Sequence, residues 1–520
     1  MRKIILLTVF LFLSAVGVTA FYFSRLRLPG QNTANVINQI PADAALIFEF
    51  KNDPEFYDLF RNNTLLTSFI RQKKAAELKY LHQHLLKNVF DQQSIFISLH
   101  PKINAKSIDL LLTTNTEGNI DLQSVLKQNA VKFQVEKVGN QELIKVDFSA
   151  IKEAFYISSK ANMLAGSFDK QLLIRFLENK RDQQKEIFKQ LPDQQKRNSI
   201  ANLYVSYKQL PVLIKQLFSN QNNEFFKLLN GFSANASLSL NYKSDALLFN
   251  GYTQTDTSVA AYINLFLKQQ PAKITLKNIY PQNTASAVSF TFSDQNQFFK
   301  ELDKWQNPEF HPVKTVFKQI KLETGISIQT VFRKQLKNEF AVITTAENEN
   351  LAVIQLKNGS EFKSYLQNLS LNPNAAQLQL KYSNLFFYLL GEPLRNFKQP
   401  YFMVLDNFLF LAETESGLHH YLNRYHQQQF LNQESQYLNF DALQADQSNV
   451  SFFVDFKNGS ELLKHMLRPE FKTAFEQQNL DWNTYYAMAM QFTASDNSFY
   501  TNFYLQQLKR DSIDTRKPNL

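Results

Sequence analysis

Short stretches in which apolar and polar residues alternate recur along the chain, and most are followed by a stretch of helical period. The first of them runs from Ala44 to Phe50. Alternation with period two predicts a half-buried strand. Asp53 then suits the N-cap of a helix, and Pro54 suits its first helical position. This part of the chain therefore predicts a strand followed by a helix.

The same strand–helix pattern returns in the second part of the sequence. Proline precedes both strands, at Pro41 and at Pro281. Four aromatic residues then recur at one constant separation: Phe48, Phe50, Phe56 and Tyr57 correspond to Phe290, Phe292, Phe298 and Phe299. Matching positions at a fixed separation indicate an internal duplication.

Further matches follow in the same order along the chain. The hairpin and helix of residues 155–176 resemble residues 401–422, Tyr207 and Lys208 match Phe456 and Lys457, and Leu238, Leu240 and Tyr242 match Met488, Met490 and Phe492. The separation widens slightly, as small loop insertions would produce. Chance similarity among amphipathic segments is the alternative, but it would not be expected to keep the order. We therefore predict two copies of one folding plan.

The repeated pattern predicts an α+β fold with two tandem halves. Each half is expected to be an antiparallel sheet joined by hairpins, as at 158–162 and 242–245, with amphipathic helices on one face. Strands are also expected at 108–112 and 351–354, with helices beginning near Asp121 and Asn358. The expected divisions are a signal anchor at 1–23, a linker at 24–35, a first half at 36–270, a second half at 271–508 and a disordered tail at 509–520.

The N-terminal residues have the pattern of a membrane anchor. Arg2 and Lys3 precede an almost unbroken apolar run at residues 4–23, and Arg25 and Arg27 follow it. An apolar run of this length spans the hydrocarbon core as a helix. Cleavage of a signal peptide after Ala20 is the alternative. With an uncleaved anchor, the protein would cross the inner membrane once and its C-terminal portion would be periplasmic.

The composition limits the cellular compartments and the kinds of catalytic or metal site that the protein can have. The chain has no cysteine, which excludes disulfides, thiol nucleophiles, iron–sulfur clusters and thiolate zinc sites. Large extracellular eukaryotic proteins usually carry disulfides, so we expect an envelope protein of a Gram-negative bacterium. The net charge of +10 is spread in short basic clusters. Such clusters are typical of solvated helix faces, and their functional interpretation is attraction to anionic head groups or acidic polymers. Without a concentrated basic stripe, we expect no nucleic-acid partner.

The stretch Pro41-Ala42-Asp43-Ala44, together with the predicted anchor, resembles an uncharacterised family known only as a domain of unknown function. Members of that family look like membrane-anchored envelope proteins of Gram-negative bacteria with repeated strand–helix units. The resemblance covers the anchor and the start of the first half. It implies location and general shape, but it implies no activity and supplies no catalytic residues.

No motif identifies a catalytic or cofactor site. The nucleophile elbow G-x-S-x-G, the zinc motif H-E-x-x-H, the Walker loop and the dinucleotide fingerprint are all absent. Asp43, Glu49, Asp53 and Glu55 gather near the first strand, but Glu49 corresponds to Thr291, so a duplicated acid pair is absent. An unmarked Ser–Lys dyad stays open as an alternative. We expect no catalytic residues and no cofactor.

The histidines are the candidate metal ligands. Glu415, His419 and His426 have helical spacings and could line one face of a helix. That set would still be incomplete without His311 or His465. Two further observations argue against a site: His82 and His84 lie on different sides of a helix, and His419 and His420 take the places of the apolar Leu173 and Ile174 of the first half. We therefore expect surface or partly buried histidines and no metal.

The densest aromatic run is Leu-Phe-Phe-Tyr-Leu-Leu at residues 385–390. It lacks alternation, which is typical of a strand buried on both faces. The alternative is a lining for an apolar ligand between sheet and helices.

Two functions follow from these patterns. The first is a non-enzymatic, membrane-anchored envelope protein whose duplicated periplasmic scaffold binds a protein or a polymer, because the halves share a scaffold but no chemistry. The alternative is a carrier or chaperone for a hydrophobic ligand such as lipid, which rests on the 48 phenylalanines and the membrane tether. An enzyme without a recognisable motif is the weaker alternative.

Overall fold

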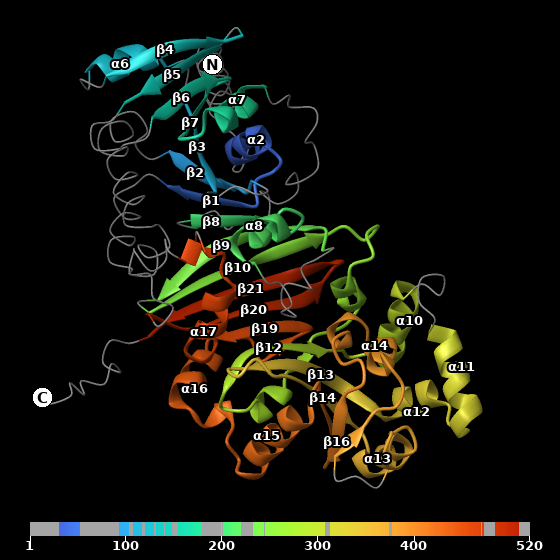
Figure 1. Ribbon diagram of the computed structural model, residues 1–520. Coiled ribbons are helices and arrows are strands. Elements are labelled where there is room, and N and C mark those ends of the chain that lie inside the picture. The colour runs from blue at the N-terminus through green and yellow to red at the C-terminus, as the bar shows by residue number, and fades with distance from the viewer. Residues whose placement is uncertain are drawn as a thin grey trace, which may run out of the picture.

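The computed structural model contains one large sheet with helices packed against it (Figure 1). It describes residues 31–51, 93–102, 108–116, 120–128, 132–139, 141–147, 154–178, 199, 201–219, 232–243, 245–306, 313–373, 377–469, 471–472 and 484–508. The predicted anchor at 1–23, the helix expected after Asp53 and the tail at 509–520 lie outside these ranges. Within them, no helix combines the length and the apolar character that crossing a bilayer requires.

Nineteen strands form the main sheet, and every strand pair in it is antiparallel, as predicted. The strands of the first half are β1 (Leu46–Lys51), β2 (Ser94–His100), β3 (Asp109–Asn115), β4 (Phe133–Val138), β5 (Gln141–Val146), β6 (Phe155–Lys160), β7 (Met163–Ser167), β8 (Ala201–Ser206), β9 (Ala234–Lys243) and β10 (Ala246–Thr255). The strands of the second half are β12 (Thr284–Thr291), β13 (Leu336–Thr345), β14 (Asn350–Leu356), β15 (Leu378–Gln379), β16 (Tyr401–Leu405), β17 (Phe408–Ala412), β19 (Val450–Asp455), β20 (Tyr485–Ser495) and β21 (Ser498–Gln507). A separate two-stranded sheet pairs β11 (Ala272–Lys273) with β18 (Gln447–Ser448).

The described helices lie between these strands. In the first half they are α2 (Gln31–Gln39), α6 (Leu122–Gln128), α7 (Lys170–Glu178) and α8 (Leu210–Leu217). In the second half they are α10 (Gln295–Trp305), α11 (Val313–Thr324), α12 (Ile328–Gln335), α13 (Gly359–Gln367), α14 (Leu385–Leu390), α15 (Glu415–His426), α16 (Ser435–Asp441) and α17 (Phe456–Met466). Short 3-10 helices are η4 (Tyr262–Phe266), η5 (Leu276–Ile279), η6 (Glu392–Leu394) and η7 (Leu431–Gln433).

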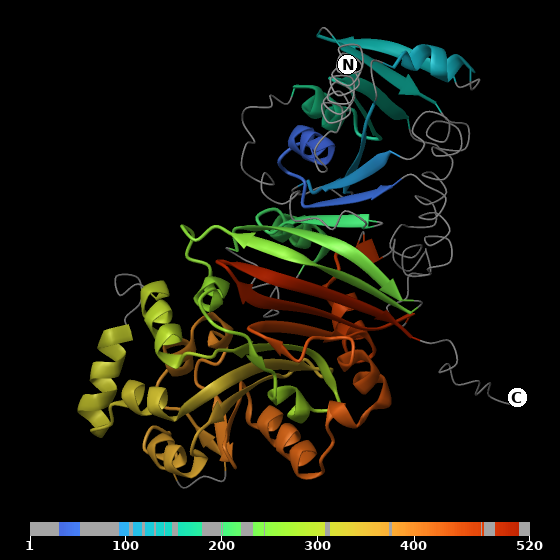
Figure 2. The ribbon, with the colours of Figure 1, turned by 180° about the vertical axis from the view of Figure 1, so that it is seen from behind.

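The order of the strands across the sheet can be followed from one edge to the other (Figures 1 and 2). From its outer edge inward, the first half runs β4-β5-β6-β7-β3-β2-β1-β8-β9-β10. From the opposite edge inward, the second half runs β15-β16-β17-β14-β13-β12-β19-β20-β21. The last strands of the two halves, β10 and β21, pair with each other and make the sheet continuous.

The register between β10 and β21 has a simple form. Ala246, the first residue of β10, pairs with Gln506 near the end of β21, and Ser498, the first residue of β21, pairs with Gln254 near the end of β10. Between these two pairs, Asn250 lies opposite Asn502. The Oγ1 atoms of Thr253 and Thr501 add a buried hydrogen bond of 2.7 Å across the junction.

Helices cover both faces of the sheet, so the predicted single covered face is wrong. On β3, Leu111 belongs to the core under α2 and α7, whereas its neighbour Leu112 belongs to the core under α6. On β13, Val342 packs in the core that includes α13, whereas Ile343 packs in the core that includes α15. Successive strand residues point to opposite faces, so apolar runs without alternation require cover on both sides.

Residues 385–390 form helix α14, so the predicted strand is wrong. Leu385, Phe386, Phe387, Leu389 and Leu390 are all buried. Short apolar runs do not distinguish a buried strand from a buried helix. Burial around the whole helix explains why the run shows neither strand alternation nor an amphipathic face.

The local predictions agree better with the structure. The expected strands coincide with β1, β3, β9, β12, β14 and β20, and the expected hairpins join β6 to β7 and β9 to β10. Asn358 caps α13 by accepting a hydrogen bond from the N–H of Glu361, and Asp294 caps α10 by accepting one from Gln297. Helix α2 begins at Gln31, within the predicted linker at 24–35.

Candidate functional site

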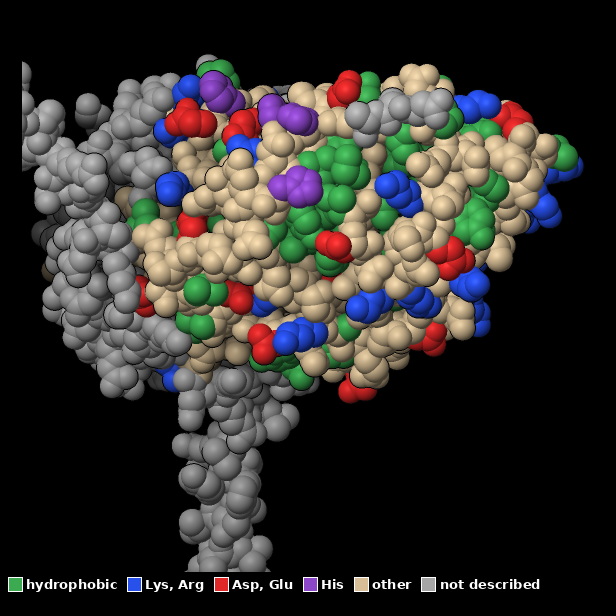
Figure 3. All heavy atoms as spheres, turned by 90° about the horizontal axis from the view of Figure 1, so that it is seen from below, with side chains coloured by type: hydrophobic (Ala, Val, Ile, Leu, Met, Phe, Trp, Pro, Cys, Tyr) green, Lys and Arg blue, Asp and Glu red, His purple; other side chains and the backbone are tan. Residues whose placement is uncertain are grey.

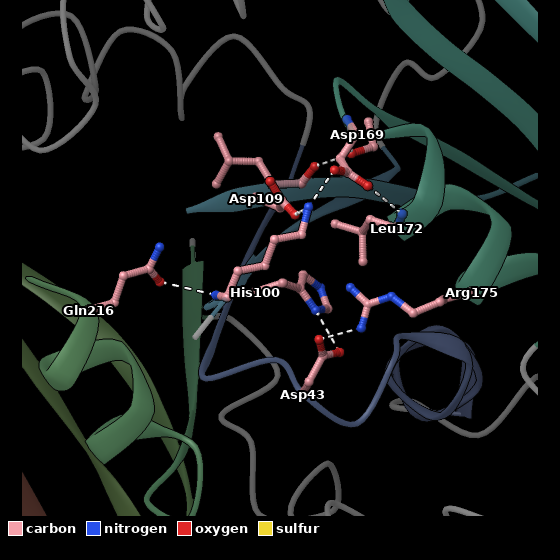
Figure 4. A network of polar contacts seen from close by, with 10 residues as sticks. Asp43, His100, Asp109, Asp169, Leu172, Arg175 and Gln216 are labelled. Carbon is pink, nitrogen blue, oxygen red and sulfur yellow. Dashed lines mark hydrogen bonds and ion pairs between the residues drawn. The ribbon is translucent and has the colours of Figure 1, made fainter. Parts of the chain in front are cut away.

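A group of polar residues in the first half surrounds the buried His100 (Figure 4). His100 Nδ1 lies 3.0 Å from Asp43 Oδ1, and His100 Nε2 lies 2.9 Å from Ser98 Oγ. Arg175 donates from its guanidinium to Asp43 Oδ2 at 2.5 Å. We call Asp43, Ser98, His100 and Arg175 the His100 network.

The fold brings these residues together from three places. Asp43 lies in the turn between α2 and β1, and Arg175 lies in the last turn of α7. Ser98 and His100 are two positions apart on β2, so both face the helices α2 and α7. The network therefore joins the entry turn, the central strand and the covering helix of the first half.

Electrostatics holds Asp43 in its charged form. Burial alone would raise the pKa of Asp43, but the hydrogen bonds and charges of His100 and Arg175 outweigh burial and lower the pKa to about 2.

A second group of charges lies beside the network (Figure 4). Lys102 Nζ lies 2.5 Å from a carboxylate oxygen of Asp109 and 2.5 Å from one of Asp169. Burial lowers the pKa of Lys102, but the two carboxylates raise it above its ordinary value. Asp169 also caps α7 by accepting from the N–H of Leu172, and Gln216 accepts from the backbone N–H of Lys102. These contacts link α7, β3 and α8.

The His100 network has the order of groups found in serine hydrolases, but it is sealed. In such enzymes a histidine activates a serine that must reach a substrate carbonyl. Ser98 and His100 are both 0% exposed, and Ser98 Oγ also donates to the carbonyl of Leu111. Chemically, the network can fix the positions of the elements it joins, and no described surface gives a substrate access to Ser98.

Each half also buries a carboxylate under the segment that precedes its first strand. In the first half, Glu49 accepts from Thr33 Oγ1 at 2.9 Å and from Tyr204 and Asn202. In the second half, Glu339 accepts from Thr275 Oγ1 at 2.5 Å and from the N–H groups of Thr275 and Leu276. Burial raises the pKa of Glu339, and these hydrogen bonds oppose the rise.

The predicted metal ligands do not converge. Glu415, His419, His420, His426 and His465 are all exposed. His420 Nδ1 lies 3.1 Å from Glu349 Oε1, an isolated pair. Among the described residues, no group of three or more histidine or carboxylate side chains is placed to hold a metal ion. In Figure 3, the histidines on the lower face lie near one another without touching. His82, His84, His311, Asp53 and Glu55 fall outside the described residues.

The helix caps correct one detail of the sequence comparison. Asp169 and Thr414 each accept from the N–H three positions later, at the start of α7 and α15. Counted from these caps, His419 and His420 lie opposite Ile174 and Arg175, one position later than the sequence comparison placed them.

A small cavity lies in the second half beneath η5 and α16. It is lined by Lys277, Tyr280, Ser289, Tyr437 and Asp441, among others, and its volume is about 20 Å³. That is room for about one water molecule. Lys277 donates to both carboxylate oxygens of Asp441 at 2.7 and 2.8 Å. The cavity is therefore too small for lipid, and its charged pair is already satisfied.

Comparison with known proteins adds no identification. No family model and no curated protein matches the chain. One solved structure that does match is titled "Structure of crystal form III of TP0453", a Treponema protein, with a TM-score of 0.24 and 12% identity over 46% of this chain and 88% of that chain. A likeness this distant defines neither a family nor a function.

Proposed function

We propose that the protein is a non-enzymatic scaffold built from two copies of one folding plan, held at a membrane by its N-terminal segment. The observation that carries the proposal is the strand order. Apart from the outer edges, the two halves have the same order, and they join through β10 and β21, the last strand of each. A continuous sheet of this kind offers a long surface for a partner.

The buried polar residues support a structural role. In the register of the two halves, Phe48 pairs with Ile97 and Phe290 pairs with Phe340. Ser98 and His100 then correspond to Ala341 and Ile343. The second copy therefore keeps the strands without the polar groups, which is expected if those groups only position α2 and α7.

We further propose that the scaffold is periplasmic and that its partner is an envelope protein or a polymer. The support is the charge and hydropathy pattern of residues 1–27 and the absence of cysteine. The described residues lend no support to the lipid-carrier alternative, because the aromatic run at 385–390 is packed into the core as α14.

A fluorophosphonate probe tests the non-enzymatic part of the proposal. Such probes label serine residues that a histidine activates and that solvent can reach. We expect no labelling of the full chain, and the same result for the matched variant Ser98→Ala. Labelling that disappears in Ser98→Ala would make the His100 network catalytic and overturn the proposal.

Affinity purification of the full chain from solubilised membranes tests the scaffold part. We expect a partner that copurifies in a defined ratio in several detergents. Recovery as a lone monomer in every detergent would contradict a binding scaffold.

A further inference from the structure

Helix α11 has one face in the core and an opposite face that carries lysines. Val313 and Ile320 are buried against the second half. Lys314, Lys318 and Lys321 are exposed, and their spacing of four and then three places them on one side of the helix. The outer surface of α11 is therefore a basic stripe.

These lysines have no ion-pair partner among the described residues, whereas nearby carboxylates are already occupied. Glu323 is bound by Lys381 and Tyr382. Asp303 is bound by Arg333, and Glu301 by Lys304. The positive charge of the stripe is thus left to attract an external anion.

An exposed leucine lies next to the stripe. Leu322 follows Lys318 by four residues, so the two side chains are neighbours on the helix surface. It is 77% exposed, the highest value among the large hydrophobic residues that the structure describes. Basic side chains around a projecting apolar one favour the interface of an anionic bilayer over a soluble polyanion, because a bilayer offers both phosphate and acyl chains.

The stripe lies at the end of the molecule remote from α2, the first helix that the structure describes. Both ribbon views place α2 and α11 at opposite ends (Figures 1 and 2). Seen from below, Lys, Arg and hydrophobic side chains are interleaved at the end where α11 lies (Figure 3). A bilayer at α11 would therefore be a contact separate from any contact made at the α2 end.

We propose that the outer face of α11 docks onto an anionic phospholipid surface through Lys314, Lys318, Lys321 and Leu322. Each lysine close to such a surface strengthens binding about fivefold, and the attraction falls within a Debye length. The proposal goes beyond the scaffold function and does not depend on the identity of its partner.

Vesicle capture of the full chain tests the proposal. The chain is reconstituted in nanodiscs of phosphatidylcholine, and capture is measured by sedimentation with vesicles of equal parts phosphatidylglycerol and phosphatidylcholine. Coelution of chain and nanodisc reports the predicted anchor separately from the α11 contact. We expect capture by the anionic vesicles, none by pure phosphatidylcholine, and release at high salt.

Two variants and one control define the outcome. The triple variant Lys314→Gln, Lys318→Gln, Lys321→Gln should weaken capture on the order of 100-fold. The control Lys127→Gln, Lys273→Gln, Lys457→Gln changes exposed lysines elsewhere by the same charge and should leave capture almost intact. Leu322→Gln should weaken capture several-fold. If both triple variants lost vesicle capture equally, capture would depend only on the net charge of the chain, and the proposal would be wrong. If Leu322→Gln left capture unchanged, the proposal of a lipid surface would be wrong, and the stripe would be assigned to a soluble polyanion.

Discussion

The two halves of the sheet share a strand order but differ in what they bury beside it. In the first half, the fully buried Ser98 and His100 form a polar network with Asp43 and Arg175. In the second half, the corresponding strand positions hold Ala341 and Ile343, which are fully buried. The difference teaches that the strand order does not require the polar network.

The two halves also differ in which strand carries the buried carboxylate, Glu49 or Glu339. Glu49 lies opposite Phe96, and Thr291, which corresponds to Glu49, lies opposite Glu339. The buried acid of the second half therefore lies on β13, next to β12, and it holds the segment before β12. Comparison of Glu49 with Thr291 in the sequence could not reveal the acid of the second half. What the two halves share is the position of the carboxylate under the segment before the first strand, and in the second half a residue of another strand supplies it.

The first prediction, with the largest effect, makes the first half resemble the second. His100→Ala should lower the free energy of unfolding by about 3 kcal/mol, because it opens a void and removes a partner of Asp43 and of the buried Ser98. The triple variant Asp43→Ala, Ser98→Ala, His100→Ile should cost less than the sum of its single changes, because an apolar replacement leaves no buried group unpaired. Denaturant unfolding measures both. A triple variant at least as damaging as that sum would contradict the comparison.

The second prediction compares the two carboxylate anchors. Thr275→Val removes a hydroxyl that donates to Glu339, which is 0% exposed, and should cost about 2 kcal/mol. Thr33→Val removes the matching donor to Glu49, which keeps Tyr204 and Asn202, and should cost about 1 kcal/mol. Thermal unfolding checks the ranking. A neutral Thr275→Val would show that the second anchor contributes nothing.

The third prediction, the smallest, concerns pH and the second half alone. Burial, with the nearby charge of Glu434, raises the pKa of Asp455 to about 6. The folded state thus binds the proton of Asp455 more tightly than the unfolded state does. The stabilisation that this proton contributes is therefore complete below pH 4 and is lost as pH rises through about 6. Asp455→Asn keeps an acceptor for the cap of α17 and should raise stability at pH 8 by about 1–2 kcal/mol, with little change at pH 4.

Asp43 serves as the control for Asp455, because its contribution to stability is expected to change with pH in the opposite direction. The lowered pKa of Asp43 makes its contribution present above pH 4 and lost as pH falls toward about 2. If Asp455→Asn changed the free energy of unfolding equally at pH 4 and at pH 8, the assignment of a raised pKa to Asp455 would be wrong.

Local signals predicted much of the fold. Alternation located β1, β9 and β12, and capping residues such as Asn358 located helix starts. Residues 340–343 and 351–354 already lacked alternation, a sign of cover on both faces that the one-face prediction overlooked.

The candidate site was harder to predict because its contacts are tertiary. Asp43 and His100 are far apart in sequence and meet only when β1 and β2 pair. The available signal was the spacing of Ser98 and His100, two polar residues on one face of an otherwise apolar strand. Nothing local marks Arg175 as their partner, because Arg175 lies on α7, 132 residues after Asp43 in the sequence.

Joining of the halves through their last strands is tested most directly by a disulfide between Asn250 and Asn502. The natural chain has no cysteine, so Asn250→Cys with Asn502→Cys gives one defined pair. Facing residues on antiparallel strands lie about 4.5–5.5 Å apart between Cα atoms, within reach of a disulfide. We expect rapid intramolecular oxidation in this variant and little in Asn250→Cys with Phe503→Cys, where the side chains point to opposite faces. Absence of the first disulfide, or equal oxidation of both variants, would contradict a single sheet joined at β10 and β21.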